Sequence, residues 1–447
     1  MSRSYWLERA WLGGPSVTSG VLVTVDAGRF TRVETVARAP DYTHRLAGLT
    51  IPGLANCHSH AFHRALRGRT QAGGGSFWTW REQMYGVAGA LDPETYYDLA
   101  LATYREMLAS GITCVGEFHY LHHQPDGTPY NDPNEMGLAL VSAARDAGIR
   151  ITLLDTCYLA SGIGQAPEGV QVRYSDGDVE RWQQRAAALA SAQSGPDVPD
   201  VVVGAAIHSV RAVPREQVKG VVTWAEERRA PLHVHLSEQP AENESCLAAY
   251  GLSPTAVLDA EGALGVRTSA VHATHLSEPD IELLGQSSTR VTFCPTTERD
   301  LGDGIGPSRS LHRAGARLTL GTDSHAVIDM FEEMRAVEMD ERLASRRRGH
   351  WSAEELLVAA TRSGHESLGF ADAGRIETGG RADLVTLDTS SVRTAGTGAD
   401  LAAVVFAATA SDVSSVVAGG RQVATGEDRA EVGRELDRVL QRVKERS

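Results

Sequence analysis

The sequence LTIPGLANCHSH at residues 49–60 decides the fold, because an apolar run typical of a β-strand ends here in two histidines. The arrangement recurs in PLHVHL at residues 231–236, whose last histidine is His235, and in RLTLGTD at residues 317–323, which ends in Asp323. Imidazole and carboxylate groups are common ligands of zinc, so three imidazoles and one carboxylate at strand ends predict a metal site. The fold must therefore bring three distant strand ends together.

Eight strand-like runs alternate with helix-like segments in the central part of the chain. Counting the run at 49–55, they are residues 49–55, 112–116, 150–154, 201–207, 231–234, 268–271, 290–294 and 317–320. Eight β/α units predict a (β/α)8 barrel of the TIM type. A doubly wound open sheet is the rival fold, but it would not easily bring the first, fifth and eighth strands to one point. The strand ends of a barrel share one rim.

The two ends of the chain show a different pattern. Residues 1–48 alternate apolar and polar positions, as in GVLVTVD at residues 20–26, which is typical of strands with one buried face. After about residue 371, strand-like runs return at 382–387, 401–406 and 413–418. We predict that residues 1–48 and 371–447 form one small β-sandwich domain with a polar C-terminal helix. This domain flanks a catalytic barrel domain at residues 49–370.

Composition excludes several classes of protein. The 447 residues carry a net charge of -14, which argues against nucleic-acid binding because phosphate contacts require a basic face. Five dispersed cysteines without a CxxC motif argue against a disulfide framework and favour a reducing, cytoplasmic environment. The first residues lack the apolar core of a signal peptide. No apolar run approaches the roughly 20 residues that span a bilayer, so no membrane association is expected.

The metal ligands predicted from the sequence are His58, His60, His235 and Asp323. His58 and His60 are two positions apart, so a continuing strand places both side chains on one face. Many binuclear sites of this kind use a carboxylated lysine on a strand. The only lysine between residues 49 and 370 is Lys219, in a helix-like segment, so one metal ion is expected.

Two further residues are predicted to take part in catalysis beside that metal. Glu238 lies three residues beyond His235 and is expected to shuttle protons from a metal-activated water, although a solvated loop glutamate is the simpler alternative. His272 ends the sixth strand-like run and is expected to polarise a substrate or stabilise developing charge. Asp323 is expected to accept the second proton as well as to bind the metal.

These residues occur in motifs that resemble those of the amidohydrolase superfamily. The matching segments are PGLANCHSH at 52–60, HVHLSE at 233–238, GTDS at 321–324 and GRIETGGRADLV at 374–385. Together they are most similar to the mononuclear deaminase branch of that superfamily. The resemblance implies one divalent cation in each chain, zinc in the first place and iron as the alternative. It also implies a homodimer.

Four other segments resemble the formiminoglutamate deiminases within that branch. They are HAFHRA at 60–65, FWTWRE at 77–82, EFHYLHH at 117–123 and IHSVRAV at 207–213. The resemblance implies that substrate is bound by His63, Arg81, Tyr120, His208 and Arg211. His63 stands where the family usually has a glutamine. Two arginines suit a substrate with two carboxylates, because a guanidinium binds a carboxylate through two parallel hydrogen bonds.

The function implied by this resemblance is hydrolysis of a small acidic amidine. N-formimino-L-glutamate would be converted to N-formyl-L-glutamate and ammonia, a step of histidine degradation. The alternative enzyme is another mononuclear deaminase acting on guanine, cytosine or a related heterocycle, which would not need two arginines in the pocket. A non-catalytic barrel that serves as a scaffold is the third possibility, but a scaffold has no need of Glu238 and His272.

Overall fold

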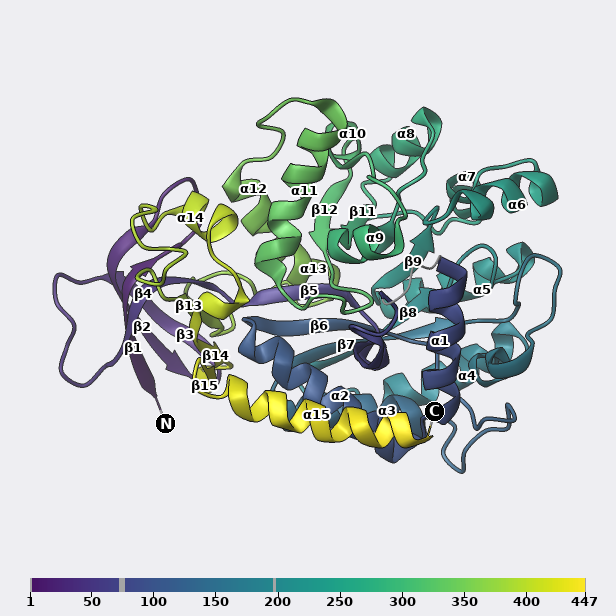
Figure 1. Cartoon of the computed structure of the whole chain (residues 1–447), viewed down its shortest axis with the longest axis horizontal. Coiled ribbons are helices and arrows are strands. Elements are labelled where there is room, and N and C mark those ends of the chain that lie inside the picture. Colours follow the sequence, from purple (N-terminus) through teal and green to yellow (C-terminus); the bar gives the residue numbers. More distant parts are fainter. Residues whose placement is uncertain (1, 72–76, 196–197, 447) are drawn as a thin grey trace.

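The computed structural model describes residues 2–71, 77–195 and 198–446, which form a barrel and a flanking sheet (Figure 1). Eight parallel strands pair in chain order in the barrel, as the sequence predicts. They are β5 (Leu54–Ser59), β6 (Ile112–His119), β7 (Arg150–Cys157), β8 (Val201–Ile207), β9 (Leu232–Leu236), β10 (Thr268–His272), β11 (Arg290–Phe293) and β12 (Arg317–Leu320). Nearly all of their residues are buried, as expected for strands covered on both faces.

The barrel is closed by backbone contacts between β5 and the residues that follow β12. The amides of Thr322 and Asp323 donate to the carbonyl of His58 at 3.2 and 2.9 Å, and the amide of His60 donates to the carbonyl of Asp323 at 3.3 Å. The side chain of Asn56 supports this seam, since it accepts from the Thr322 amide and donates to the Thr322 hydroxyl. Predicted metal ligands thus lie at the point where the first and last strands meet.

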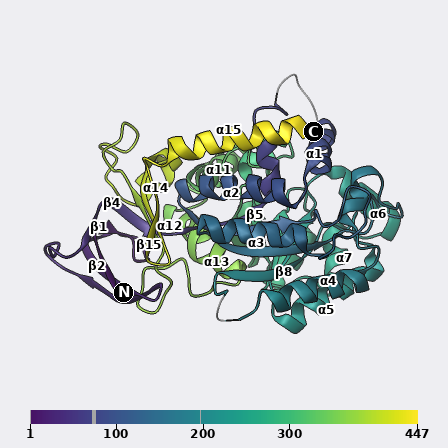
Figure 2. The ribbon, with the colours of Figure 1, turned by 90° about the horizontal axis from the view of Figure 1, so that it is seen from below.

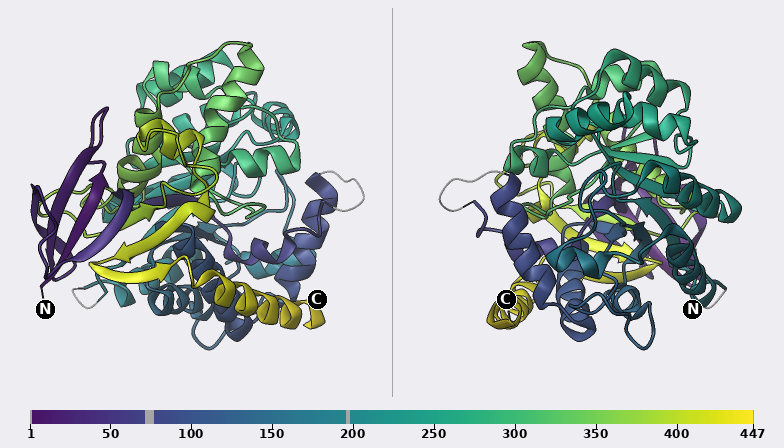
Figure 3. Two further views of the ribbon diagram at one scale, coloured as in Figure 1. Left: turned by 60° about the vertical axis from the view of Figure 1, so that its left-hand side comes forward. Right: turned by 90° about the vertical axis from the view of Figure 1, so that its right-hand side faces the viewer.

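The two chain ends form one hydrogen-bonded sheet of seven strands, in the order β15-β14-β13-β4-β1-β2-β3. Figure 3 shows the N-terminal and C-terminal strands side by side at one end of the molecule. The domain predicted as a β-sandwich is thus organised as a single continuous sheet. Its strands are β1 (Arg3–Ala10), β2 (Thr18–Asp26), β3 (Arg29–Thr35), β4 (His44–Pro52), β13 (Leu384–Leu387), β14 (Val413–Ala418) and β15 (Arg421–Thr425).

Two strand predictions require correction. The apolar run at 49–55 is not one barrel strand, because its first half completes β4 in the small sheet and the barrel begins at Leu54. Gly53 separates the two strands, directly after Pro52 ends β4, and a Pro-Gly pair commonly marks such a break. The run at 401–406 is the helix α14 and not a strand. The carboxylate of Asp400 accepts from the amide of Ala403 and caps this helix, and a short apolar run does not distinguish a buried helix from a strand.

Helices surround the barrel and cover its strands. The α-helices are α1 (Phe77–Ala90), α2 (Pro93–Ala109), α3 (Glu135–Ala147), α4 (Val179–Ala192), α5 (Arg215–Arg228), α6 (Pro240–Tyr250), α7 (Pro254–Ala260), α8 (Glu278–Gln286), α9 (Pro295–Leu301), α10 (Ser308–Ala314), α11 (Met330–Ser345), α12 (Ala353–Val358), α13 (Gly364–Ser367), α14 (Leu401–Phe406) and α15 (Arg429–Arg446). Short helical turns of other kinds are η1 (Ala61–Leu66), η2 (Gly169–Tyr174), η3 (Ala359–Ser363) and η4 (Ala410–Asp412).

The helices near the pocket begin and end where the sequence signals it. Asp92 caps α2 through the amide of Thr95, Pro93 is its first residue, and Gly111 follows its end with φ +91°.

The C-terminal helix α15 runs along the outside of the barrel over α2 and ends beside α1 (Figure 2). Within the described residues, no helix combines the length and the apolar character needed to cross a bilayer.

A buried ion pair joins the small sheet to the lower end of the barrel. The Arg150 guanidinium, on β7, binds both carboxylate oxygens of Asp383 at 2.6 Å, and both residues are at most 4% exposed. Burial alone would raise the pKa of Asp383, but Arg150 outweighs burial and holds the pKa below its usual range. Asp383 also accepts from the amide of Gly419 at 2.9 Å. One carboxylate therefore ties β13, β14 and β7 together.

Asp383→Ala is expected to lower the free energy of unfolding by about 3–5 kcal/mol, because it leaves the Arg150 charge buried without its partner. Urea denaturation followed by circular dichroism measures this change. Glu34→Ala is the matched control, since Glu34 pairs with Arg32 on the exposed face of β3. The control is expected to change stability by less than about 1 kcal/mol. Equal stability of both variants would contradict the assigned role of Asp383.

Candidate active site

The four predicted metal ligands lie together at the carboxyl end of the barrel strands. The ligand nitrogens of His58, His60 and His235 lie within 4.8 Å of one another. The Nε2 atoms of His58 and His235 are 3.0 Å apart, and Asp323 Oδ1 lies 3.4 Å from His58 Nε2 and 3.3 Å from His60 Nε2. All four residues are buried. This rim is where TIM barrels place their active sites.

Backbone carbonyls orient two of the imidazoles toward a common centre. The Nδ1 atom of His60 donates to the carbonyl of Phe118, and that of His235 donates to the carbonyl of His208, both at 2.9 Å. A neutral imidazole that donates from Nδ1 keeps its lone pair on Nε2. Burial lowers the pKa of both histidines, which keeps them neutral. Both rings therefore present a lone pair to the centre between them.

This arrangement fits a tetrahedral cation. Ligands 2.0–2.1 Å from a zinc ion lie about 3.3 Å apart, which is close to the observed spacing of the histidine nitrogens and the Asp323 oxygen. A carbonyl that holds the other nitrogen of a ligating histidine is the usual support of such sites. Lys219, the only lysine in the barrel region, is exposed on α5 and far along the chain from any strand end. The residues present suit a single ion.

Glu238 and His272 lie next to this cluster, as the sequence predicts. The Nε2 atom of His272 is 3.9 Å from Glu238 Oε1 and 3.9 Å from Asp323 Oδ2, while its Nδ1 atom lies 3.3 Å from Glu298 Oε1. Burial alone would lower the pKa of His272, but these carboxylates outweigh burial and raise the pKa to about 10. Burial raises the pKa of Glu238, with His272 opposing that effect. A cationic donor thus faces two carboxylates across the pocket.

Backbone strain gathers around the same residues. Ser237, His272, Ala273 and Asp323 have φ angles of +49°, +68°, +49° and +40°, in the left-handed region that residues other than glycine seldom adopt. Ser237 follows β9, His272 and Ala273 end and follow β10, and Asp323 lies three residues after β12. Such conformations cost about 1–3 kcal/mol each and persist where the surrounding structure enforces them, often at active sites. Two of these residues, His272 and Asp323, line the pocket, so the backbone strain accompanies the placement of their side chains there.

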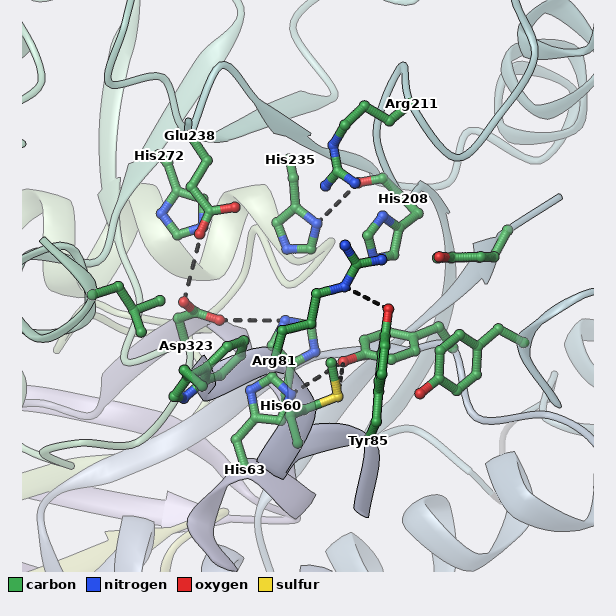
Figure 4. A pocket seen from close by; sticks show the side chains of 16 residues that line it. His60, His63, Arg81, Tyr85, His208, Arg211, His235, Glu238, His272 and Asp323 are labelled. Carbon is green, nitrogen blue, oxygen red and sulfur yellow. Dashed lines mark hydrogen bonds and ion pairs between the residues drawn. The ribbon is translucent and has the colours of Figure 1, made fainter. Parts of the chain in front are cut away.

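All five residues predicted to bind substrate line one pocket above the cluster (Figure 4). They are His63 on η1, Arg81 on α1, Tyr120 after β6, and His208 and Arg211 after β8. With its open mouth included the pocket has a volume of about 600 Å³, which suits a small molecule. The His63 Nε2 atom and the Tyr120 hydroxyl are 3.1 Å apart. Arg211 forms a 3.5 Å ion pair with the buried carboxylate of Glu242.

The structure adds residues that the sequence did not indicate. Tyr85, Tyr158 and Tyr174 line the pocket, together with Trp80, Met84 and Leu301. Tyr85 lies four residues after Arg81 on α1, so helical spacing could have indicated it. Tyr174 belongs to η2, within the Gly-rich stretch 161–175 that reads as a loop. No local signal connects this stretch to the pocket, because only the folded barrel brings it there.

Comparison with known proteins agrees with this geometry. The model of the amidohydrolase family matches residues 49–423. The chain belongs to the amidohydrolase family. A formimidoylglutamate deiminase of Pseudomonas aeruginosa is 38% identical over 363 residues, which cover 78% of each chain. A 5-methylthioadenosine/S-adenosylhomocysteine deaminase of Pelotomaculum thermopropionicum is 29% identical over 84% of this chain and 80% of its own.

Solved structures of amidohydrolases and deaminases share the whole fold. An amidohydrolase from Brucella melitensis is 31% identical, covers 99% of both chains and superposes with a TM-score of 0.90. An adenosine deaminase from Xanthomonas campestris, solved with bound zinc, is 26% identical with a TM-score of 0.85 over 99% of this chain and 98% of its own. These two structures thus share both the barrel and the small sheet with this chain.

Proposed function

We propose that this amidohydrolase hydrolyses N-formimino-L-glutamate to N-formyl-L-glutamate and ammonia, a step of histidine degradation. One observation carries the proposal: Arg81 and Arg211 line the same pocket as Glu238, His272 and Asp323. Two guanidinium groups suit the two carboxylates of this substrate. The 38% sequence identity with the formimidoylglutamate deiminase of Pseudomonas aeruginosa supports the same substrate. A guanine or cytosine deaminase would not need two arginines in its pocket.

We further propose that His58, His60, His235 and Asp323 hold one divalent cation, zinc in the first place and iron as the alternative. When bound, such an ion lowers the pKa of a coordinated water toward neutrality and so supplies a nucleophile. The zinc in the Xanthomonas campestris structure supports the choice of metal. The homodimer and the cytoplasmic location implied by the family resemblance stay predictions.

Glu238 and Asp323 each transfer one proton in the proposed reaction. The Glu238 carboxylate takes one proton from the attacking water and gives it to the imino nitrogen of the substrate. His272 donates a hydrogen bond toward the oxygen that adds to the formimino carbon and stabilises its developing charge. Asp323 accepts the remaining hydroxyl proton as the carbonyl forms and passes it to the departing nitrogen. The C–N bond breaks, and ammonia leaves behind an N-formyl amide.

Substrate preference tests this function directly. Ammonia release is measured from N-formimino-L-glutamate, N-formimino-L-aspartate, guanine and cytosine with the zinc-loaded protein. We expect kcat/KM to be highest for N-formimino-L-glutamate by more than about 10-fold, because the shorter acid cannot place both carboxylates against both arginines. Guanine and cytosine are expected to release no ammonia. Turnover of a heterocycle without turnover of either formimino acid would establish the alternative deaminase class.

A further inference from the structure

A chain of hydrogen bonds links Arg81 to two tyrosines that the sequence did not indicate. Arg81 Nε donates to the hydroxyl of Tyr85 at 2.5 Å, and its guanidinium carbon lies 5.1 Å from the centre of the Tyr85 ring. The side-chain nitrogen of Gln171, on η2, donates to the hydroxyls of Tyr85 at 3.0 Å and Tyr158 at 2.8 Å. Three separate elements of the barrel rim thus meet at one buried amide.

The orientation of the Gln171 amide follows from its own contacts. Its Oε1 atom accepts from the backbone amide of Glu168 at 3.2 Å, at the start of η2. The opposite end of the amide must then be the NH2 group, which has two hydrogens to donate. Tyr85 and Tyr158 each receive one of them. Gln171 is 4% exposed, so these bonds form away from competing water.

The Tyr85 hydroxyl therefore accepts two hydrogen bonds and still has a hydrogen to donate. A phenol oxygen offers two acceptor positions in this geometry, and Arg81 and Gln171 occupy both. In the part of the chain that the structure describes, no side chain or carbonyl accepts the Tyr85 hydrogen. Tyr85 lines the pocket, and Figure 4 shows it on the side away from Glu238 and His272. Its hydrogen is thus available to a ligand.

We propose that the Tyr85 hydroxyl donates a hydrogen bond to a substrate carboxylate that Arg81 also binds. Tyr85 would then be a specificity-determining residue, and Gln171 a positioning residue that acts through it. This inference rests on the proposed function and deepens it, since it assigns one carboxylate of the substrate to Arg81 and Tyr85 on α1. A guanidinium and a phenol side by side present N–H and O–H donors to a ligand. This donor set suits an anionic carboxylate, to which its hydrogen bonds are charge-assisted.

Tyr85→Phe tests the proposal because it removes the hydroxyl and keeps the ring. KM for N-formimino-L-glutamate is expected to rise about 10- to 100-fold, the usual effect of losing a hydrogen bond to a charged group. Because the reacting atoms are untouched, kcat is expected to change less than about 3-fold. Calorimetric titration with the product N-formyl-L-glutamate should show the same weakening of Kd. Tyr97→Phe is the matched control, since it removes a surface tyrosine hydroxyl that donates to Asp146.

Two substrate analogues identify the carboxylate involved. N-formimino-4-aminobutyrate lacks the α-carboxylate, and N-formimino-L-norvaline lacks the side-chain carboxylate. The KM increase caused by Tyr85→Phe is expected to disappear for one analogue and to persist for the other. An equal increase for both would indicate general damage to the pocket and would overturn the inference. If the wild-type enzyme turns over N-formimino-L-glutamate and Tyr85→Phe leaves KM and Kd unchanged, the inference is also overturned. Failure of the wild-type enzyme on this substrate would instead overturn the proposed function.

Gln171→Met tests the positioning role, because methionine has a similar length and no hydrogen to donate. We expect KM to rise about 3- to 10-fold, less than for Tyr85→Phe, since the phenol itself is retained. In the Tyr85→Phe background the same change is expected to add less than about 2-fold, because Gln171 acts through the lost hydroxyl. Gln83→Met, on the exposed face of α1, is the control. Fully multiplicative effects of the two substitutions would contradict the coupling.

Discussion

Glu238→Gln is expected to lower kcat by about 10²- to 10⁴-fold, the usual contribution of a general acid–base group. The substitution keeps the shape of the side chain and removes its capacity to take a proton from water. Glu238 lies at the edge of the proposed ligand set, with Oε1 3.9 Å from His272 Nε2, and its side chain is 12% exposed. The metal content should therefore stay at one ion per chain. Steady-state ammonia release and elemental analysis measure the two quantities.

Glu244→Gln is the matched control for this variant, because Glu244 is exposed on α6, six residues farther along the chain. It should retain wild-type kcat. Normal turnover in Glu238→Gln would refute proton transfer by this residue. Loss of the metal from Glu238→Gln would show instead that the carboxylate is a ligand, which would require a different mechanism.

His235→Ala is expected to weaken metal binding by more than about 100-fold. Losing only the hydrogen-bond partner of a ligating histidine costs about 10- to 100-fold in metal affinity, and this change removes the ligand itself. The His235 Nε2 atom lies 3.0 Å from that of His58, so the substitution removes a nitrogen from the centre of the proposed site. Turnover should fall with metal content and recover in part at high zinc concentration. Competition with a zinc-binding dye measures the affinity.

His44→Ala is the control for that experiment, because His44 is exposed at the start of β4, in the small sheet. Circular dichroism and the Tm of both variants establish that they are folded. The wild-type protein should gain stability when zinc is added, since a ligand that binds only the native state raises Tm. A folded His235→Ala variant that keeps wild-type zinc affinity would contradict the proposed ligand set.

The barrel could be predicted because its strands are buried on both faces and therefore read as apolar runs between helices. The gathering of His58, His60, His235 and Asp323 could be predicted for the same reason, since a residue that follows an apolar barrel strand must reach the shared rim. That reasoning does not distinguish a strand from a helix in a short apolar run. Residues 401–406 are apolar throughout, and the helix that they form is settled by the Asp400 cap and by packing, not by periodicity.

The tyrosines that line the pocket, Tyr85, Tyr158 and Tyr174, could not be predicted in the same way. Tyr85 and Gln171 are separated by 86 residues, and neither follows a barrel strand. Tyr158 follows β7 directly, but an aromatic residue at a strand end is common in buried cores and carries no specific signal. These residues act through contacts that exist only after α1 and η2 have packed against the rim. Apart from the helical spacing of Tyr85 after Arg81, no local pattern in the sequence reports these contacts.

The seam between β5 and the segment after β12 also sets an order of events during synthesis. The Asn56 side chain bonds to Thr322 across 266 residues, so one edge of the seam leaves the ribosome long before the other. At roughly 5–20 residues per second, this interval lasts about 13–50 s. A chain truncated before the last strand would therefore lack both the seam that closes the barrel and the Asp323 carboxylate.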